Sequence, residues 1–193
     1  MRSALSITLI TCTLLCTVQC VASHGARAAR GAAAAKSPAR TRTKEQQDFL
    51  AKLDLFKKQG QAAFSDEKAR EKRGGCPHAF STFEMVTCLG HEIEKTTANY
   101  KAYVGALHSV EGLKNPAESD EKGPGGQALS AEEGVTEFDG VEAAWQTYHK
   151  AQCTAAYDAY RPGTIAPVVE LTCHLQLMRD HMRELENIYQ LMN

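Results

Sequence analysis

The chain has 193 residues, of which 43% are hydrophobic and 23% charged, an ordinary composition for one globular domain with extensions. The net charge of −1 is unevenly distributed: residues 23–75 hold 13 Lys and Arg against 6 Asp and Glu (+7), residues 76–193 hold 8 against 17 (−9), and Arg2 adds +1. An acidic domain favours a basic macromolecule over a nucleic acid as partner, although acidic helix faces can also serve solubility alone.

The first 22 residues have the layout of a secretory signal peptide. They begin with Met-Arg-Ser, continue through an apolar run and reach small residues at Ala22 and Ser23. We expect cleavage, because the run has only about 18 residues and no stop-transfer charges follow it; a retained membrane anchor is the alternative. The mature protein is then expected to be periplasmic or secreted, without stable membrane insertion.

Two segments precede the cysteine-containing part of the chain. Residues 23–43 are rich in Ala, Arg and Gly, which predicts a disordered basic linker that either touches an anionic envelope surface or is a plain spacer. Residues 44–75 show a helical pattern of apolar residues among charges, interrupted at Gly60. They predict a charged helix, with its docking left open, that stops at Gly74 and Gly75.

Residues 76–193 predict an all-α bundle of three to four helices. One helix is expected to start near Ser81 or Thr82, and its apolar residues recur at spacings of three and four. Residues 114–130 have the Pro, Gly and acidic content of an exposed loop. The next helix starts with a capping box at Ser130 or, because glycines weaken its first turns, near Asp139.

The predicted core combines three helices of this part. The second helix is expected to bury Val141, Trp145, Tyr148, Gln152 and Ala156. The last helix starts around Pro167 and carries an apolar stripe that includes Ile188 and ends at Leu191. No stretch alternates with period two long enough to form a strand, so we expect antiparallel helices packed around Trp145 and Tyr100.

Four cysteines remain once the signal peptide is removed: Cys76, Cys88, Cys153 and Cys173. Three pairings are possible, and proximity in sequence favours Cys76 with Cys88 and Cys153 with Cys173. Each closed loop would stabilise the fold by roughly 3 kcal/mol. The chain has no C-x-x-C and its spacing does not match a zinc knuckle, so we predict structural disulfides rather than a metal site or a redox pair.

Histidines provide only a weak metal candidate. His174, Met178 and His181 share one face of the last helix at i, i+4 and i+7, a pattern that suits copper but is more typical of core packing. His78 and His149 are interpreted as ordinary polar residues. We predict no cofactor.

The sequence also lacks the patterns of common enzymes. It contains no G-x-S-x-G, its glycine-rich stretch at 123–126 lacks the residues of a phosphate-binding loop, and no carboxylate pair stands out as that of a glycosidase. We therefore predict that the protein is not an enzyme.

The first cysteine pair carries a family resemblance. Thr82, Glu84 and Met85 precede Cys88, and Cys76 lies twelve positions before Cys88. This segment resembles the T-x-E-M-x-x-C signature of the LprI-type lysozyme-inhibitor N-terminal domain family, which comprises small exported helical domains of bacterial envelopes. The resemblance extends to residue 189 through the order Trp145, Cys153, Gly163, Thr164, Cys173 and Leu185.

The resemblance implies local pairing of the cysteines and a protein that binds and blocks a basic lysozyme. A contact would come from residues 118–133 or from the turn at 161–164, with Arg161, Thr164 and His149 as candidate contact residues. The chain has His149 and His181 where the family usually has Arg, and Thr97 where it often has Asp. A structural or interaction module of the envelope without inhibitory activity is the alternative.

Overall fold

The computed structural model describes residues 42–116 and 130–191. The predicted signal peptide, all but the last two residues of the predicted linker and most of the predicted 114–130 loop lie outside them. The described residues form four helices and no strand: α1 (Lys44–Arg73), α2 (Thr82–Glu111), α3 (Ala131–Ala159) and α4 (Ala166–Tyr189). The prediction of an all-α bundle is confirmed.

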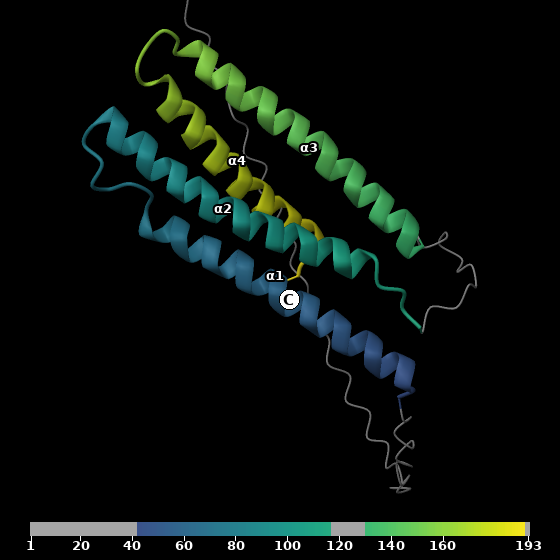
Figure 1. The fold of residues 1–193 in the computed structure, drawn as a ribbon. Coiled ribbons are helices and arrows are strands. Elements are labelled where there is room, and N and C mark those ends of the chain that lie inside the picture. Colours follow the sequence, from purple (N-terminus) through teal and green to yellow (C-terminus); the bar gives the residue numbers. More distant parts are fainter. Residues whose placement is uncertain (1–41, 117–129, 192–193) are drawn as a thin grey trace, which may run out of the picture. The chain divides into compact units, whose positions relative to one another are not determined.

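The α2 and α4 helices form the centre of the bundle, with α1 packed on α2 and α3 packed on both. Successive helices run in opposite directions (Figure 1). The α1–α2 connection and the α3–α4 connection therefore lie at the same end, whereas α2 ends and α3 begins at the other. None of the described helices combines the length and apolar character needed to span a membrane.

Capping boxes fix where three helices begin. Thr43, Ser81 and Ser130 cap α1, α2 and α3, each through reciprocal hydrogen bonds with the residue three positions on. The α3 helix thus starts at Ala131, and the alternative start near Asp139 is wrong. The two capping hydrogen bonds outweigh the cost of glycine in the first turns.

The α1 helix is continuous through Gly60, although the pattern of apolar residues is interrupted there. A Cβ atom at Gly60 would lie 2.2 Å from Leu191 Cδ2 and 3.2 Å from the Ala106 Cβ atom. The glycine therefore permits a close approach of α1 to the rest of the bundle. At the other end of α1, Gly74 adopts φ 80°, a conformation that favours glycine, and ends the helix as predicted.

All four helices contribute to the described core. Phe64 of α1 and Tyr103 of α2 pack with ring centroids 5.3 Å apart, and Tyr100 lies 5.1 Å from the half-buried Trp145. The other members of the core are Ala63, Ala106, Leu107, Phe138, Met182, Leu185 and Leu191. The apolar face of α1 is thus part of the same core as the three helices that follow it.

The buried face of α3 differs from the predicted one. Val141 and Tyr148 are 48% and 54% exposed, and Gln152 is also exposed. The helix instead buries Phe138, Glu142 and Cys153. The hydrophobic pattern predicted the wrong face because Glu142 is buried with hydrogen-bonding partners on other helices. Cys153 is buried because it forms a disulfide with Cys173. Ile188 of α4, assigned to the buried stripe, is also exposed.

Both local disulfides are present, which confirms the predicted pairing. Cys76, just before α2, is bonded to Cys88 within it, and the bond between Cys153 and Cys173 joins α3 to α4. Cys153 is fully buried, whereas the other three are half-buried.

Candidate functional site

One end of the bundle collects both disulfide-bordered connections. Residues 74–81 lead from α1 to α2 there, and residues 160–165 lead from α3 to α4 (Figure 1). We call this end, with the first turn of α2, the staple end. It is the part of the described structure where connections between helices are short and covalently constrained.

Four exposed apolar side chains lie on the elements of the staple end. Phe80 and Phe83 are 89% and 79% exposed, and Tyr160 and Ile165 on the other connection are about half exposed. Exposed aromatic rings in a group are typical of surfaces that bind another protein. Since none of these four side chains contributes to the core, they are available for such a contact.

The backbone that carries Phe80 is held by Glu84. The amide groups of Phe80 and Ser81 each donate to Glu84 Oε2 at 3.0 Å, and the Ser81 hydroxyl does so as well. The backbone hydrogen bond from Phe80 and those from Ser81 lower the pKa of Glu84. Glu84, a residue of the family motif, therefore orders the segment between Cys76 and the start of α2.

The second connection presents the predicted contact residues Arg161 and Thr164, both exposed. The Arg161 guanidinium pairs with Asp158 and lies 5.0 Å from the centroid of the Tyr157 ring. Gly163 donates a hydrogen bond to the Tyr160 carbonyl at 2.8 Å, and a Cβ atom at this position would lie 3.0 Å from that oxygen. The motif glycine thus keeps the turn tight.

A cleft of about 600 Å³ borders the staple end between the end of α1 and α2. Its lining mixes charges of both signs. Arg70, one of the lining residues, donates to the Glu92 carboxylate at 2.6 Å, and Asp66 accepts from Asn99 at 2.8 Å. Arg70 and Asp66 are therefore already paired within the protein.

His181, one of the departures from the family pattern, belongs to a buried cluster between α2, α3 and α4. Its Nε2 atom lies 2.7 Å from Glu142 Oε1, and its ring stacks on Trp145 at 4.2 Å with an interplanar angle of 7°. The Tyr100 hydroxyl donates to the same carboxylate. Burial, and then the hydrogen bond and charge of Glu142, raise the pKa of Tyr100, so its hydroxyl remains a donor.

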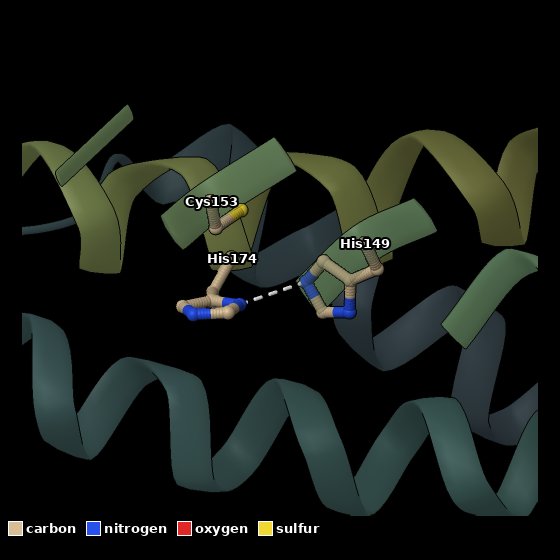
Figure 2. Close-up of side chains that lie close together, drawn as sticks. All are labelled: His149, Cys153 and His174. Atoms are coloured by element: carbon tan, nitrogen blue, oxygen red, sulfur yellow. Dashed lines mark hydrogen bonds between the residues drawn. The ribbon is translucent and has the colours of Figure 1, made fainter. Parts of the chain in front are cut away.

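His149 lies beside this cluster rather than on an open surface. Its Nε2 atom is 3.0 Å from His174 Nδ1, and its ring stacks on Trp145 at 4.6 Å. Burial and the neighbouring His174 lower the pKa of His149. Figure 2 shows the two rings next to Cys153, whose sulfur is bonded to Cys173. As a candidate contact residue His149 is therefore half-buried and already paired.

The three side chains of the predicted metal face on α4 each contact different residues. His181 Nε2 faces Glu142, and its Nδ1 atom lies 3.4 Å from Glu184. Met178 Sδ accepts a hydrogen bond from the hydroxyl of Thr97, another departure from the family pattern. His174 turns instead toward His149 of α3. The three predicted side chains share a helix face but not a common point.

A second buried polar cluster holds α1. Glu67 accepts hydrogen bonds from Thr96 and Asn99 of α2 at 2.7 and 3.0 Å, and from Arg179 of α4 at 2.7 Å. Burial alone would raise the pKa of Glu67, but the hydrogen bonds from Arg179, Thr96 and Asn99 lower it overall. Glu67 thus joins three helices at once.

The remaining motif residues have structural roles. Thr82 opens α2, Met85 is half-buried, and Leu185 is 1% exposed in the core. Sequence reasoning did not single out Phe80, Phe83, Glu67 or Glu142. The two phenylalanines stand inside the disulfide-bracketed segment, which was a usable signal, whereas nothing local distinguishes the two buried glutamates from the exposed ones.

Comparison with family models places this chain in a known family. A family model described as "Lysozyme inhibitor LprI" matches residues 76–185, which is 110 of the 193 residues. Comparisons with curated proteins and with solved structures found no significant match. The matched region contains α2, α3, both disulfides and most of α4. The chain therefore belongs to the LprI lysozyme inhibitor family.

Proposed function

We propose that this protein is exported, binds a basic lysozyme without covalent chemistry and blocks it, with the staple end as the contact surface. The family match over residues 76–185 is the observation that carries the proposal. Export is supported by the signal-like N-terminal sequence and by two disulfides, which persist in oxidising compartments. The protein then acts by occupation of its partner and not by catalysis.

The staple end suits this role because its binding groups are held in place before contact. The Cys76–Cys88 bond and the hydrogen bonds to Glu84 constrain the segment that carries Phe80 and Phe83. A constrained surface loses little conformational freedom on binding, and aromatic and Arg side chains supply most of the energy in many interfaces. Arg161 and Thr164 contribute polar contacts from the neighbouring turn.

Charge supports a basic partner. Residues 76–193 carry a formal charge of 8 − 17 = −9. An acidic domain attracts a basic enzyme over a distance and accelerates association, while the apolar groups at the staple end stabilise the complex. Inhibition is therefore expected to weaken as ionic strength rises.

The other candidate contact, residues 118–133, is mostly outside the described residues. Its last four, from Ser130, begin α3 at the end of the bundle opposite the staple end. The two candidates therefore occupy different surfaces, and substitutions can separate them.

The test is a lysis assay in which the mature protein is added to lysozyme and a peptidoglycan suspension. We expect inhibition by wild type, and Phe80→Ala/Phe83→Ala to weaken it by at least about 10-fold, as loss of two central aromatic groups does in interfaces. Ile188→Ala is the matched control, because Ile188 is 64% exposed and lies in the last turn of α4, away from the staple end. Thermal unfolding of all three proteins checks that the fold is kept.

Two outcomes would change the proposal. If wild type at micromolar excess slows none of several lysozymes, the inhibitor function is wrong, and a pull-down that isolates a stable partner other than lysozyme supports an interaction module instead. If wild type inhibits and the phenylalanine variant inhibits equally well, the function stands but the contact lies elsewhere. Substitution of the acidic residues at 118–133 is then the next comparison.

A further inference from the structure

Four side chains with metal-binding atoms meet where α3 faces α4. His149 and Cys153 lie one turn apart on α3, and Cys173 and His174 are adjacent on α4. A nitrogen of each histidine ring and Cys153 Sγ all lie within 4.8 Å of one another (Figure 2). Cys173 is bonded to Cys153, so the fourth donor is at the same place.

We propose that this junction is a redox-gated zinc site: the disulfide closes it, and reduction by a dithiol opens a Cys153, Cys173, His149 and His174 ligand set. Two thiolates and two imidazoles form one of the ligand sets that structural zinc sites use in proteins. While the disulfide is intact, only the two imidazoles are available, and they form a much weaker site. The site is independent of the proposed lysozyme contact.

The geometry is close to what zinc requires. Tetrahedral Zn²⁺ holds sulfur at about 2.3 Å and nitrogen at about 2.0 Å, which places neighbouring donors roughly 3–4 Å apart. His149 Nε2 and His174 Nδ1 are already 3.0 Å apart, and Cys153 Sγ lies within 4.8 Å of one nitrogen of each ring. Small side-chain rotations are therefore enough to bring the donors around one ion.

The surroundings orient the histidines. The His149 ring stacks on Trp145 at 4.6 Å, and both histidines are half-buried, which leaves a route for an ion from solvent. Fixed ligand orientation of this kind raises metal affinity. The Cys76–Cys88 bond has no such neighbourhood, because the described residues contain only this one group of three converging ligands.

Reduction of the disulfide by a dithiol takes two thiol–disulfide exchange steps. A thiolate of the dithiol attacks Cys173 Sγ, which is less buried than Cys153, the protein S–S bond breaks and Cys153 leaves as a thiolate. The second thiolate of the reductant then displaces Cys173 and closes the reductant's own disulfide. The reductant loses two electrons, the protein disulfide gains them, and the two protons of the dithiol pass to solvent as both cysteine thiolates bind Zn²⁺.

The experiment uses a Cys76→Ser/Cys88→Ser variant of the full mature chain, so that only one cysteine pair remains. It is reduced anaerobically with a dithiol, the reductant is removed, and Zn²⁺ is titrated against a chromophoric chelator. We expect one zinc per chain, bound at least about 100-fold more tightly than by the disulfide form, because two anionic ligands are added. Titration with Co²⁺ should give thiolate-to-metal charge-transfer absorption.

Histidine variants test whether the assigned ligands are correct. In the same background, His149→Asn and His174→Asn should each weaken zinc binding by about 10-fold or more. His91→Asn is the matched control, because His91 is an exposed α2 histidine whose side chain is 69% accessible. Zinc binding with an unchanged affinity in both ligand variants would overturn the assignment.

Loss of the disulfides could unfold the domain, so helicity is followed by circular dichroism. If the reduced variant has lost helix content, one equivalent of Zn²⁺ should restore it, and this restoration should be absent in the His149→Asn variant. If zinc neither binds the reduced protein nor restores its helix content, the proposal is wrong.

Discussion

The α1 and α3 helices both pack against the α2–α4 pair, and each contributes one buried carboxylate to it. Glu67 of α1 is 3% exposed and Glu142 of α3 is 5% exposed. Both accept hydrogen bonds from α2 and contact a basic side chain of α4. Both outer helices thus contact the central α2–α4 pair through a buried glutamate with the same kinds of partner.

The two carboxylates differ in their partners. Glu67 lies against Arg179 and within 3.5 Å of Arg70, two permanent cations whose side chains are 10% and 7% exposed. Glu142 has the Tyr100 hydroxyl and His181. A buried charge without its partner costs far more than a neutral group without one. The α1 helix, which the family match does not cover, is therefore the neighbour that depends more on electrostatics.

The two helices also differ in whether a disulfide attaches them to the central pair. The bond between Cys153 and Cys173 ties α3 directly to α4, whereas Cys76–Cys88 ties only the connection after α1 to α2. A disulfide attaches α3 to α4, whereas α1 is held without one, by close packing at Gly60 and by the hydrogen bonds of Glu67. Substitutions at the two carboxylates can show how much each helix relies on its polar cluster.

The largest effect is expected for Glu67→Gln, which leaves Arg179 without its carboxylate and Arg70 with Glu92 alone. The free energy of unfolding should fall by about 3–5 kcal/mol, as measured by urea denaturation. Glu71→Gln is the control, because its ion pair with Arg183 is exposed and should contribute only about 0–1 kcal/mol. Similar losses in the two variants would contradict the importance of the buried cluster.

A smaller loss is expected for Glu142→Gln. The amide oxygen can still accept from Tyr100, so the free energy of unfolding should fall by about 1–3 kcal/mol. Glu137→Gln, at an exposed position of the same helix, removes the same charge and serves as control. A loss equal to that of Glu67→Gln would show that removing the carboxylate beside His181 costs as much stability as removing the one beside Arg179 and Arg70.

The smallest change in the free energy of unfolding is expected when the pH is lowered enough to protonate Glu67. Because the pKa of Glu67 is lowered below its ordinary value of 4.5, its contribution is present above pH 4.5 and is lost as the pH falls through the lowered pKa. Urea denaturation of wild type and Glu67→Gln over this range should show a constant difference above pH 4.5 that narrows below it. A constant difference down to the lowest pH would mean that Glu67 does not titrate.

Sequence reasoning was most successful where the signal is local. The helix start near Ser81, the capping box at Ser130, the stop at Gly74 and the proximity of the paired cysteines each depend on residues a few positions apart. Such signals act through backbone hydrogen bonds and short loops, which sequence spacing describes directly. The family motif also lies in these local elements.

Reasoning failed where a polar residue is buried or an apolar one exposed. The face of α3 was assigned by hydrophobicity, which favoured Val141 and Tyr148 over Glu142 and Cys153. A glutamate is a core residue only when partners on other helices satisfy it, and those partners are distant in sequence. The same limit applies to the departures His181 and Thr97, which find partners in the structure despite the loss of the family's charged residues.

The sequence by itself determined the helices, the two disulfides and the family of this protein, because caps, periodicity and cysteine spacing are properties of short segments. Only the tertiary structure decided that Phe80 and Phe83 lie at the same end as Arg161, and that His149 and His174 meet beside a disulfide. These arrangements depend on the direction and rotation of packed helices. Side-chain packing and buried hydrogen bonds between distant residues set that direction and rotation.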